Sequence, residues 1–210
     1  MTRVLACALA LGAALALTEV ALRATSFRRQ AWDPEFGWIV QPGSEMRAWG
    51  EGRGRSRWTV HGIRRDAPIP AGLSRVMVMG DSFTEAFQVN DDETFCAAAE
   101  ASLARAGLPV PILNAGRASR SPADYVAQAP LYLQTFHPRW TVVQVNDADF
   151  EGDSWRTDKT HFVRDDATGE LRVKVVETKG PNGRLRWRIY NEVVNRVALV
   201  PWALGRLARV

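Results

Sequence analysis

The stretch that decides the fold is Val76-Met77-Val78-Met79-Gly80-Asp81-Ser82-Phe83-Thr84. Its first four residues are apolar, which is typical of a buried strand in a parallel sheet. Gly80 then allows a sharp turn at the carboxyl end of this strand. In open α/β sheets that end is where ligands bind, so Ser82 is a candidate nucleophile. For these residues alone, an ordinary strand-to-helix turn capped by a hydroxyl remains an equal alternative.

Two more short strands end in small or polar residues. Residues 111–116 read Pro-Ile-Leu-Asn-Ala-Gly, and residues 141–147 read Thr-Val-Val-Gln-Val-Asn-Asp. Helices are expected over residues 94–106 and 122–136, between these strands. Strands that alternate with helices predict right-handed crossovers and a parallel α/β sheet. The three turns then lie at one edge of the sheet, which is a physical reason for Ser82, Gly116 and Asn146 to converge.

In order, spacing and strand context, these segments resemble the SGNH (GDSL-type) hydrolases. Gly80-Asp81-Ser82 matches the first motif of that family, and Gly116 matches the glycine of the second. Residues 144–147 match the third motif, G-x-N-D, with Gln144 in the place of its glycine. The resemblance covers about residues 60–150 and is nearest to the membrane-anchored bacterial branch. It implies a flavodoxin-like SGNH hydrolase fold, a parallel sheet sandwiched by helices.

The resemblance also implies roles for individual residues. Ser82 is the implied nucleophile, and the oxyanion hole is made by its own amide, the Gly116 amide and the Asn146 side chain. Asp81 and Asp147 are expected to support their loops by accepting hydrogen bonds. The other acids after the third strand, Asp149 and Asp153, are expected to be solvated.

The general base departs from the family pattern. Family members carry a D-x-x-H motif near the C-terminus, whereas this chain ends at Val210 in a helix-like stretch. It contains Asp158-Lys159-Thr160-His161 soon after the third motif, so His161 and Asp158 are the provisional base and its partner. The favoured expectation is that the chain is a fragment lacking its tail or a relative that has lost activity.

Composition restricts the class of partner and cofactor. The chain has 210 residues, 46% of them hydrophobic, enough for one domain with appendages. Its net charge of +4 comes from dispersed arginines without a nucleic-acid-binding motif, so no nucleic-acid partner is expected. The 3 histidines are isolated and the 2 cysteines form no C-x-x-C, so no metal or other cofactor is expected.

The N-terminus is strongly apolar. As a helix, residues 4–22 extend about 28 Å at about 1.5 Å per residue, close to the thickness of a bilayer core. We expect an uncleaved membrane anchor with the rest of the chain outside the cytoplasm, in the periplasm. The alternative is a signal peptide cleaved after the small-x-small triplet Ala14-Leu15-Ala16, which would give a secreted protein.

The expected organisation has three parts. Residues 1–25 form the anchor or signal segment, residues 26–70 an irregular neck, and residues 71–210 the hydrolase-like domain. Alternating apolar and charged residues predict a small β insertion over residues 155–188, either a lid or a cover for the sheet edge. Residues 190–210 have the spacing of an amphipathic helix.

Two functions follow from this sequence. The first is an exported serine esterase or O-acyl (acetyl) transferase, acting on an ester of a carbohydrate, a lipid or an envelope polymer. The second is a non-catalytic envelope protein for binding or assembly, which retains the fold without the catalytic histidine.

Overall fold

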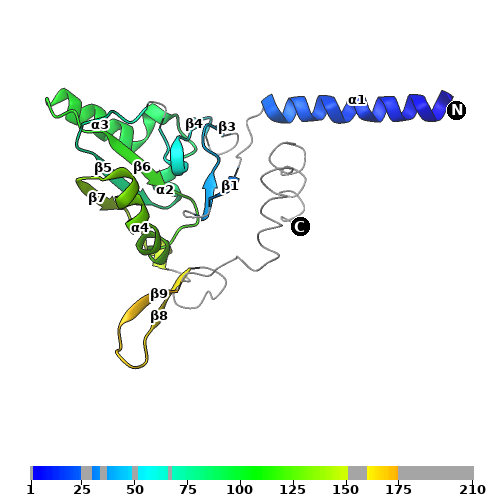
Figure 1. Cartoon of the computed structure of the whole chain (residues 1–210). Helices are drawn as coiled ribbons and strands as arrows, with labels where there is room; N and C mark the ends of the chain where they lie inside the picture. Colours follow the sequence, from blue (N-terminus) through cyan, green and yellow to red (C-terminus); the bar gives the residue numbers. More distant parts are fainter. Residues whose placement is uncertain are drawn as a thin grey trace.

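The central element is a sheet of three parallel strands with the order β6-β5-β7 (Figure 1). The computed structural model describes residues 2–24, 30–33, 37–48, 52–65, 68–150 and 160–174, and the statements below concern these residues. The strands are β5 (Val76–Gly80), β6 (Ile112–Gly116) and β7 (Trp140–Val143). Gly80 pairs with Gly116 at the carboxyl end of the sheet. The prediction of a parallel α/β sheet is therefore confirmed.

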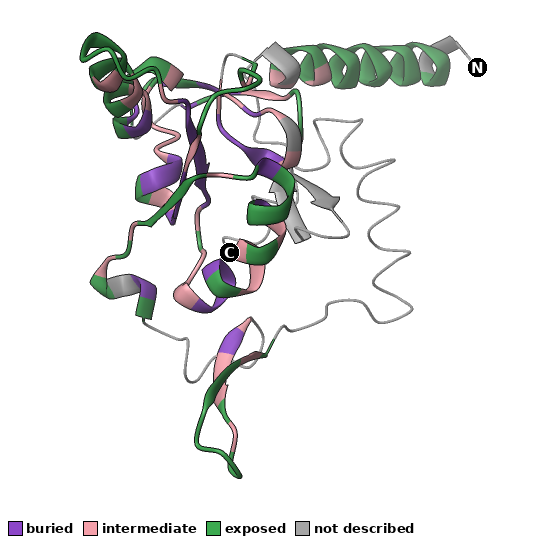
Figure 2. Cartoon of the chain, turned by 60° about the vertical axis from the view of Figure 1, so that its left-hand side comes forward, coloured by how far each residue is buried: buried purple, intermediate pink, exposed green. Residues whose placement is uncertain are grey.

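Two helices cover opposite faces of β5 and β6, because successive side chains of a strand point to opposite faces. Met77 and Met79 pack with Tyr132 and Phe136 of α4 (Pro122–Phe136). On the other face Val78 packs with residues of α3 (Phe95–Arg105). Figure 2 shows buried residues in the central strands and on the helices that pack against them. All four residues of β7 are exposed, so within the described residues this edge strand has no such cover.

The predicted helix boundaries are confirmed to within one residue at each end. Thr94 caps α3, since its hydroxyl accepts a hydrogen bond from the Ala97 amide at 3.1 Å. The helix α4 begins at Pro122, as predicted, and ends before His137. His137 adopts a left-handed conformation with φ 46°, and its amide donates to the Leu133 carbonyl at 3.0 Å.

The prediction of an irregular neck over residues 26–70 was wrong for the described part of that stretch. It contains two antiparallel pairs: β1 (Gln30–Asp33) with β2 (Gly37–Val40), and β3 (Glu45–Arg47) with β4 (Arg55–Arg57). Trp58, 2% exposed, packs with Val40, Met46 and Phe87. Strands of three or four residues are too short to give a periodic signal, and this packing with Phe87 ties them to the domain.

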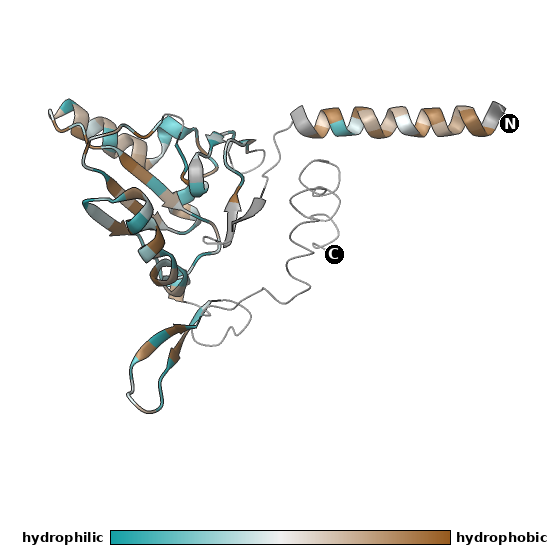
Figure 3. Cartoon of the chain, viewed as in Figure 1, coloured by the Kyte–Doolittle hydropathy of each residue, from teal (hydrophilic) through white to brown (hydrophobic). Residues whose placement is uncertain are grey.

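The N-terminal helix α1 (Thr2–Ala24) confirms the apolar helix expected from the sequence. Its segment Val4–Leu22 has a mean hydropathy of 2.1, and none of it is buried. Figure 3 shows hydrophobic residues over most of this helix. By length and composition alone the segment is able to cross a membrane, and a signal sequence has the same properties.

A short antiparallel hairpin lies within the predicted β insertion. Its strands are β8 (His161–Arg164) and β9 (Leu171–Lys174), and both contact α4. The Asp165 carboxylate closes the turn by accepting hydrogen bonds from the amides of Ala167 and Thr168, each at 3.0 Å. The rest of the insertion and the amphipathic segment over residues 190–210 lie outside the described residues.

Candidate active site

The candidate nucleophile lies at the start of a single helical turn. This turn, α2 (Ser82–Glu85), follows β5 directly. Buried Asp81 caps it, because its Oδ1 accepts a hydrogen bond from the Phe83 amide at 2.9 Å. The turn closes when the Ala86 amide donates to the Ser82 carbonyl at 2.8 Å. Ser82 is half-buried and therefore in partial contact with solvent.

Asp81 also joins the first motif to the third. Its second oxygen, Oδ2, accepts a hydrogen bond from Nδ2 of Asn146 at 2.9 Å. Because Ser82 directly follows Asp81, the hydroxyl and the Asn146 amide are held at the same edge of the sheet. The bond uses one of the two hydrogens on the amide nitrogen. The structure thus brings Asn146 into contact with Asp81, the residue that precedes Ser82 in the chain.

Gln144, which stands where the family has a glycine, reaches the same turn. Its side-chain Oε1 accepts a hydrogen bond from the Thr84 hydroxyl at 2.8 Å. Its backbone amide donates to the Met79 carbonyl at 2.9 Å. The longer side chain therefore bonds to α2 from the side of β7. It adds a support to the turn that carries Ser82.

Gly116 lies directly beneath α2. A Cβ built on Gly116 would be 2.3 Å from the Glu85 nitrogen and 2.5 Å from the Thr84 carbonyl carbon, so only glycine allows this approach. Its amide donates to Asn114 Oδ1 at 2.9 Å, and Asn114 Nδ2 donates in turn to the Thr84 carbonyl at 2.7 Å. The Gly116 amide is thus engaged by Asn114, whereas the family resemblance assigns it to the oxyanion hole.

The expectation that Asp149 is a solvated loop acid was wrong. It is 5% exposed, and its Oδ2 accepts hydrogen bonds from the Asn146 amide at 3.1 Å and the Tyr125 hydroxyl at 3.4 Å. Burial, and secondarily the nearby charge of Asp81, raise the pKa of Asp149. Burial and the charge of Asp149 likewise raise the pKa of Tyr125.

Only the position of Asp149 in the chain could have indicated, from the sequence, that its carboxylate bonds to the Asn146 amide. Three residues after Asn146, it lies in the 3-10 turn η3 (Asp147–Phe150), where a short acidic side chain is able to bond back to the preceding backbone. Tyr125, its other partner, is 24 residues away and gives no such signal. Asp147, the predicted supporting residue, begins this turn and is exposed.

The provisional base, His161, lies in the β8–β9 hairpin and not in the turns that carry Ser82 and Asn146. His161 begins β8 and is 5% exposed, in the hairpin that contacts α4. In Figure 1 this hairpin lies beyond α4, on the side of the domain away from α3. Asp158 lies outside the described residues. The role of His161 as the base therefore stays a prediction.

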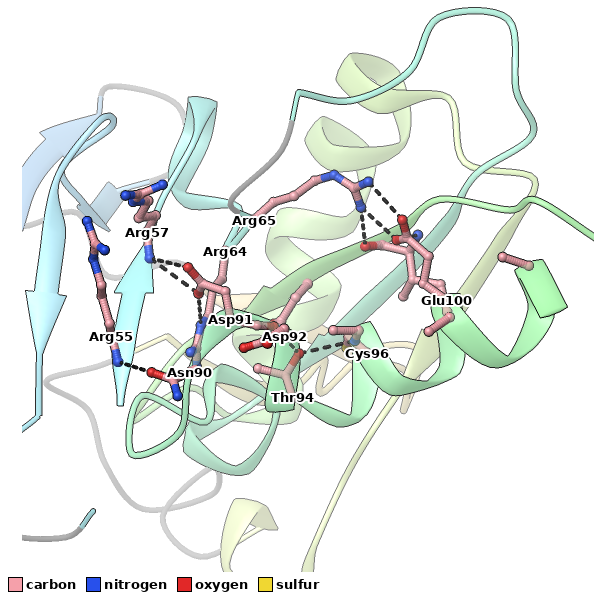
Figure 4. Close-up of a pocket in the computed structure, with 15 residues that line it drawn as sticks. Arg55, Arg57, Arg64, Arg65, Asn90, Asp91, Asp92, Thr94, Cys96 and Glu100 are labelled. Carbon is pink, nitrogen blue, oxygen red and sulfur yellow. Dashed lines mark hydrogen bonds and ion pairs between the residues drawn. The ribbon is translucent and has the colours of Figure 1, made fainter. Parts of the chain in front are cut away.

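A separate cavity of about 570 Å³ lies between β4, α3 and the 3-10 turn η2 (Asp91–Glu93) (Figure 4). Neither Ser82 nor Asn146 is among its lining residues. Its arginines have acidic partners: Arg65 binds both carboxylate oxygens of Glu100, at 2.7 and 2.8 Å, and Arg64 binds Asp91. Among the described residues there is also no group of three or more His, Cys, Asp or Glu side chains able to hold a metal ion.

Comparison with known proteins gives partial likenesses. No protein-family model matches the chain, and no curated protein matches it. Among solved structures it is similar to AlinE4, described as an SGNH-hydrolase family esterase, with 20% identity and a TM-score of 0.35. A serine-to-alanine mutant of AlinE4 matches with 18% identity and a TM-score of 0.34. The likeness to AlinE4 covers 39% of this chain and 44% of that chain, so this chain spans less than half of it.

Proposed function

We propose that this protein is an exported serine esterase or O-acyl (acetyl) transferase with the flavodoxin-like SGNH hydrolase fold. Its substrate is an ester of a carbohydrate, a lipid or an envelope polymer. The observation that carries the proposal is the double role of Asp81, which caps the turn of Ser82 and holds the Asn146 amide at 2.9 Å. This double role supports the proposal, because acyl transfer requires a hydroxyl nucleophile and an amide donor at the same site.

The chemistry of this arrangement has two stages. Ser82 Oγ attacks the ester carbonyl carbon while its proton passes to a base. The Ser82 amide and Asn146 Nδ2 stabilise the oxyanion, and each such donor typically contributes about 3 kcal/mol. The C–O bond then breaks, and the alcohol leaves with the proton from the base. Water, or an acceptor hydroxyl in the transferase, then gives its proton to the base and attacks the acyl carbonyl carbon. The bond between the acyl group and Ser82 Oγ breaks, Ser82 takes the proton from the base, and the free acid or the new ester is released.

The remaining residues support this chemistry. Asp81 orients Asn146, and Asp147 begins the turn that follows it. Gly116 allows α2 to lie against β6, and its amide becomes a third oxyanion donor when it leaves Asn114 Oδ1. His161, paired with Asp158, is the base that the sequence offers. The proposed reaction uses no cofactor or metal.

A fluorophosphonate probe tests the nucleophile. The full chain in detergent is incubated with the probe, and the modified peptide is identified by mass spectrometry. We expect labelling at Ser82 that the Ser82→Ala variant abolishes, while a control, Ser102→Ala on the exposed face of α3, labels as the wild type does. Labelling that persists in Ser82→Ala would overturn the assignment.

The base is tested by His161→Ala in the same assay. Removing the base of a serine site leaves only residual catalysis, because a serine hydroxyl is a weak nucleophile without one. If His161 is the base, labelling slows by at least about 100-fold. Unchanged labelling would exclude it, and the hairpin would then have a structural role alone.

One observation favours the alternative of a non-catalytic envelope protein. The Gly116 amide, which the enzymatic proposal needs as a donor, bonds to Asn114 Oδ1 at 2.9 Å. In that alternative the wild type is not labelled by the probe and aryl acetates are not hydrolysed above the buffer rate. Probe labelling of Ser82 therefore separates the two functions.

The location proposed is a membrane anchor formed by α1, with the domain in the periplasm. Its support is the apolar segment Val4–Leu22 with Arg3 at its N-terminal end. Sequencing of the mature N-terminus tests the proposal. An intact N-terminus supports the anchor, whereas a new terminus near residue 17 means cleavage and secretion.

A further inference from the structure

We propose that Arg64 is a positioning residue that holds the turn of Ser82 from its C-terminal end. This inference rests on the proposed role of Ser82 as the nucleophile. Arg64 lies outside the three motifs, 18 positions before Ser82 (82 − 64 = 18), and its side chain is 1% exposed. A buried guanidinium is stable only when its donors are bonded, so its partners show what it does.

The partners of Arg64 are the carbonyl groups at the end of α2 and in the loop that follows, together with Asp91, which Figure 4 labels beside it. Its Nη1 donates to the Glu85 carbonyl at 2.5 Å and also to the Ala86 carbonyl. Its Nη2 donates to the Val89 carbonyl at 2.6 Å, and its Nε donates to Asp91 Oδ1 at 2.8 Å. One side chain therefore binds two successive carbonyl groups at this helix end and a third in the loop that follows.

These bonds act directly on the conformation of Ser82. The Ala86 amide donates to the Ser82 carbonyl at 2.8 Å, and Ala86 itself has φ 49°, which costs a non-glycine residue on the order of 1 kcal/mol. A helix of one turn is also unstable by itself, because nucleation is unfavourable. Arg64 stabilises both the turn and the left-handed residue that ends it.

Arg64 is itself fixed to the sheet. Its backbone amide donates to the Asn114 carbonyl at 2.9 Å, in an antiparallel bridge to β6. The Asn114 side chain donates to the Thr84 carbonyl of α2. The turn is therefore connected to β6 along two routes. A lysine has the same charge but no planar fork, so it is unable to bind these acceptors at once.

The test compares Arg64 with its neighbour. Arg65 is a matched control, because it is also a largely buried arginine in an ion pair, with Glu100. Its side chain donates hydrogen bonds to Glu100 and to the Ile112 carbonyl. Full-length Arg64→Met, Arg64→Lys and Arg65→Met are purified in detergent, and the labelling rate is corrected for the folded fraction. Labelling by the fluorophosphonate is measured at several concentrations, which separates probe binding from the maximal rate.

We expect the maximal rate of labelling to fall by about 100-fold in Arg64→Met with unchanged probe binding, since a displacement of about 1 Å has that effect on a reacting group. Arg64→Lys recovers part of the rate, and Arg65→Met stays within about 3-fold of the wild type. If Arg64→Met does not fold, the labelling rate of Arg64→Lys relative to that of Arg65→Met tests the inference. Equal slowing in the Arg64 and Arg65 variants would overturn the inference.

A second measurement separates this inference from the proposed function. Hydrogen exchange at the amides of Glu85 and Ala86, which close α2, reports the turn whether or not Ser82 reacts. We expect at least about 10-fold faster exchange in Arg64→Met than in Arg65→Met. An unlabelled wild type would overturn the proposed function, whereas unchanged exchange at these two amides would overturn the positioning role of Arg64.

Discussion

Replacing Gly116 by alanine tests the contact between α2 and β6 on which the whole site depends. The new Cβ would lie 2.3 Å from the Glu85 nitrogen and 2.5 Å from the Thr84 carbonyl carbon, whereas an ordinary contact needs at least 3.4 Å. Both atoms belong to the backbone, so no side-chain rotation relieves the clash, and α2 must move by about 1 Å. Overpacking of this kind costs about 1–3 kcal/mol, and we expect the upper end.

Urea unfolding of the full chain in detergent measures this cost. A loss of about 3 kcal/mol lowers the unfolding midpoint by about 1–3 M urea at the slopes usual for small domains. Gly72→Ala is the control, because Gly72 has φ +75° and no atom within 4 Å, so its alanine variant suffers only the conformational cost of about 1 kcal/mol. A Gly116→Ala variant no less stable than Gly72→Ala would refute the close packing of α2 on β6.

Three further predictions concern titratable groups. Burial raises the pKa of Cys96 to about 12, so iodoacetamide at pH 8 should leave it unmodified in the folded protein and alkylate it in urea. Burial raises the pKa of Asp149, so the stability that this residue contributes is lost as the pH rises above the ordinary pKa of 3.8. The Asp149→Asn variant does not titrate at this position, so its resistance to urea relative to the wild type should increase from pH 4 to pH 7. Burial opposes ionisation of Glu100, but hydrogen bonds from Arg65 and the Ile112 amide outweigh it and lower the pKa of Glu100. The free energy of unfolding of the wild type should therefore fall as the pH falls below 4.5, and Glu100→Gln should not show this loss.

The parts of the fold that the sequence predicted are those with strong local signals. The strand β5 is a run of apolar residues that ends in glycine, and α4 has proline at its first position and Pro138 shortly after its last residue. The alternation of strands and helices along the chain then predicted that the turns after the strands lie at one edge of the sheet, because right-handed crossovers make the strands parallel. The contact between Asp81 and Asn146 follows from this topology.

The parts that the sequence did not predict depend on contacts between distant residues. The hairpin of β3 and β4 is only three residues long on each side, and Trp58 is buried against Phe87, which is 29 positions away (87 − 58 = 29). Asp149 is buried because α4 brings Tyr125 to it. Neither contact leaves a periodic pattern in the residues around it.

Besides Gln144, three side chains support the turn of Ser82 from different directions. Asp81 caps its start, Asn114 binds its underside at the Thr84 carbonyl, and Arg64 binds its end at the Glu85 and Ala86 carbonyls. A four-residue helix has too few internal hydrogen bonds to hold one conformation, so its order must come from these neighbours. None of the three contacts involves a histidine. The geometry of the proposed nucleophile is thus maintained without the proposed base, and under the proposed function loss of the base would stop turnover while the turn of Ser82 kept its shape.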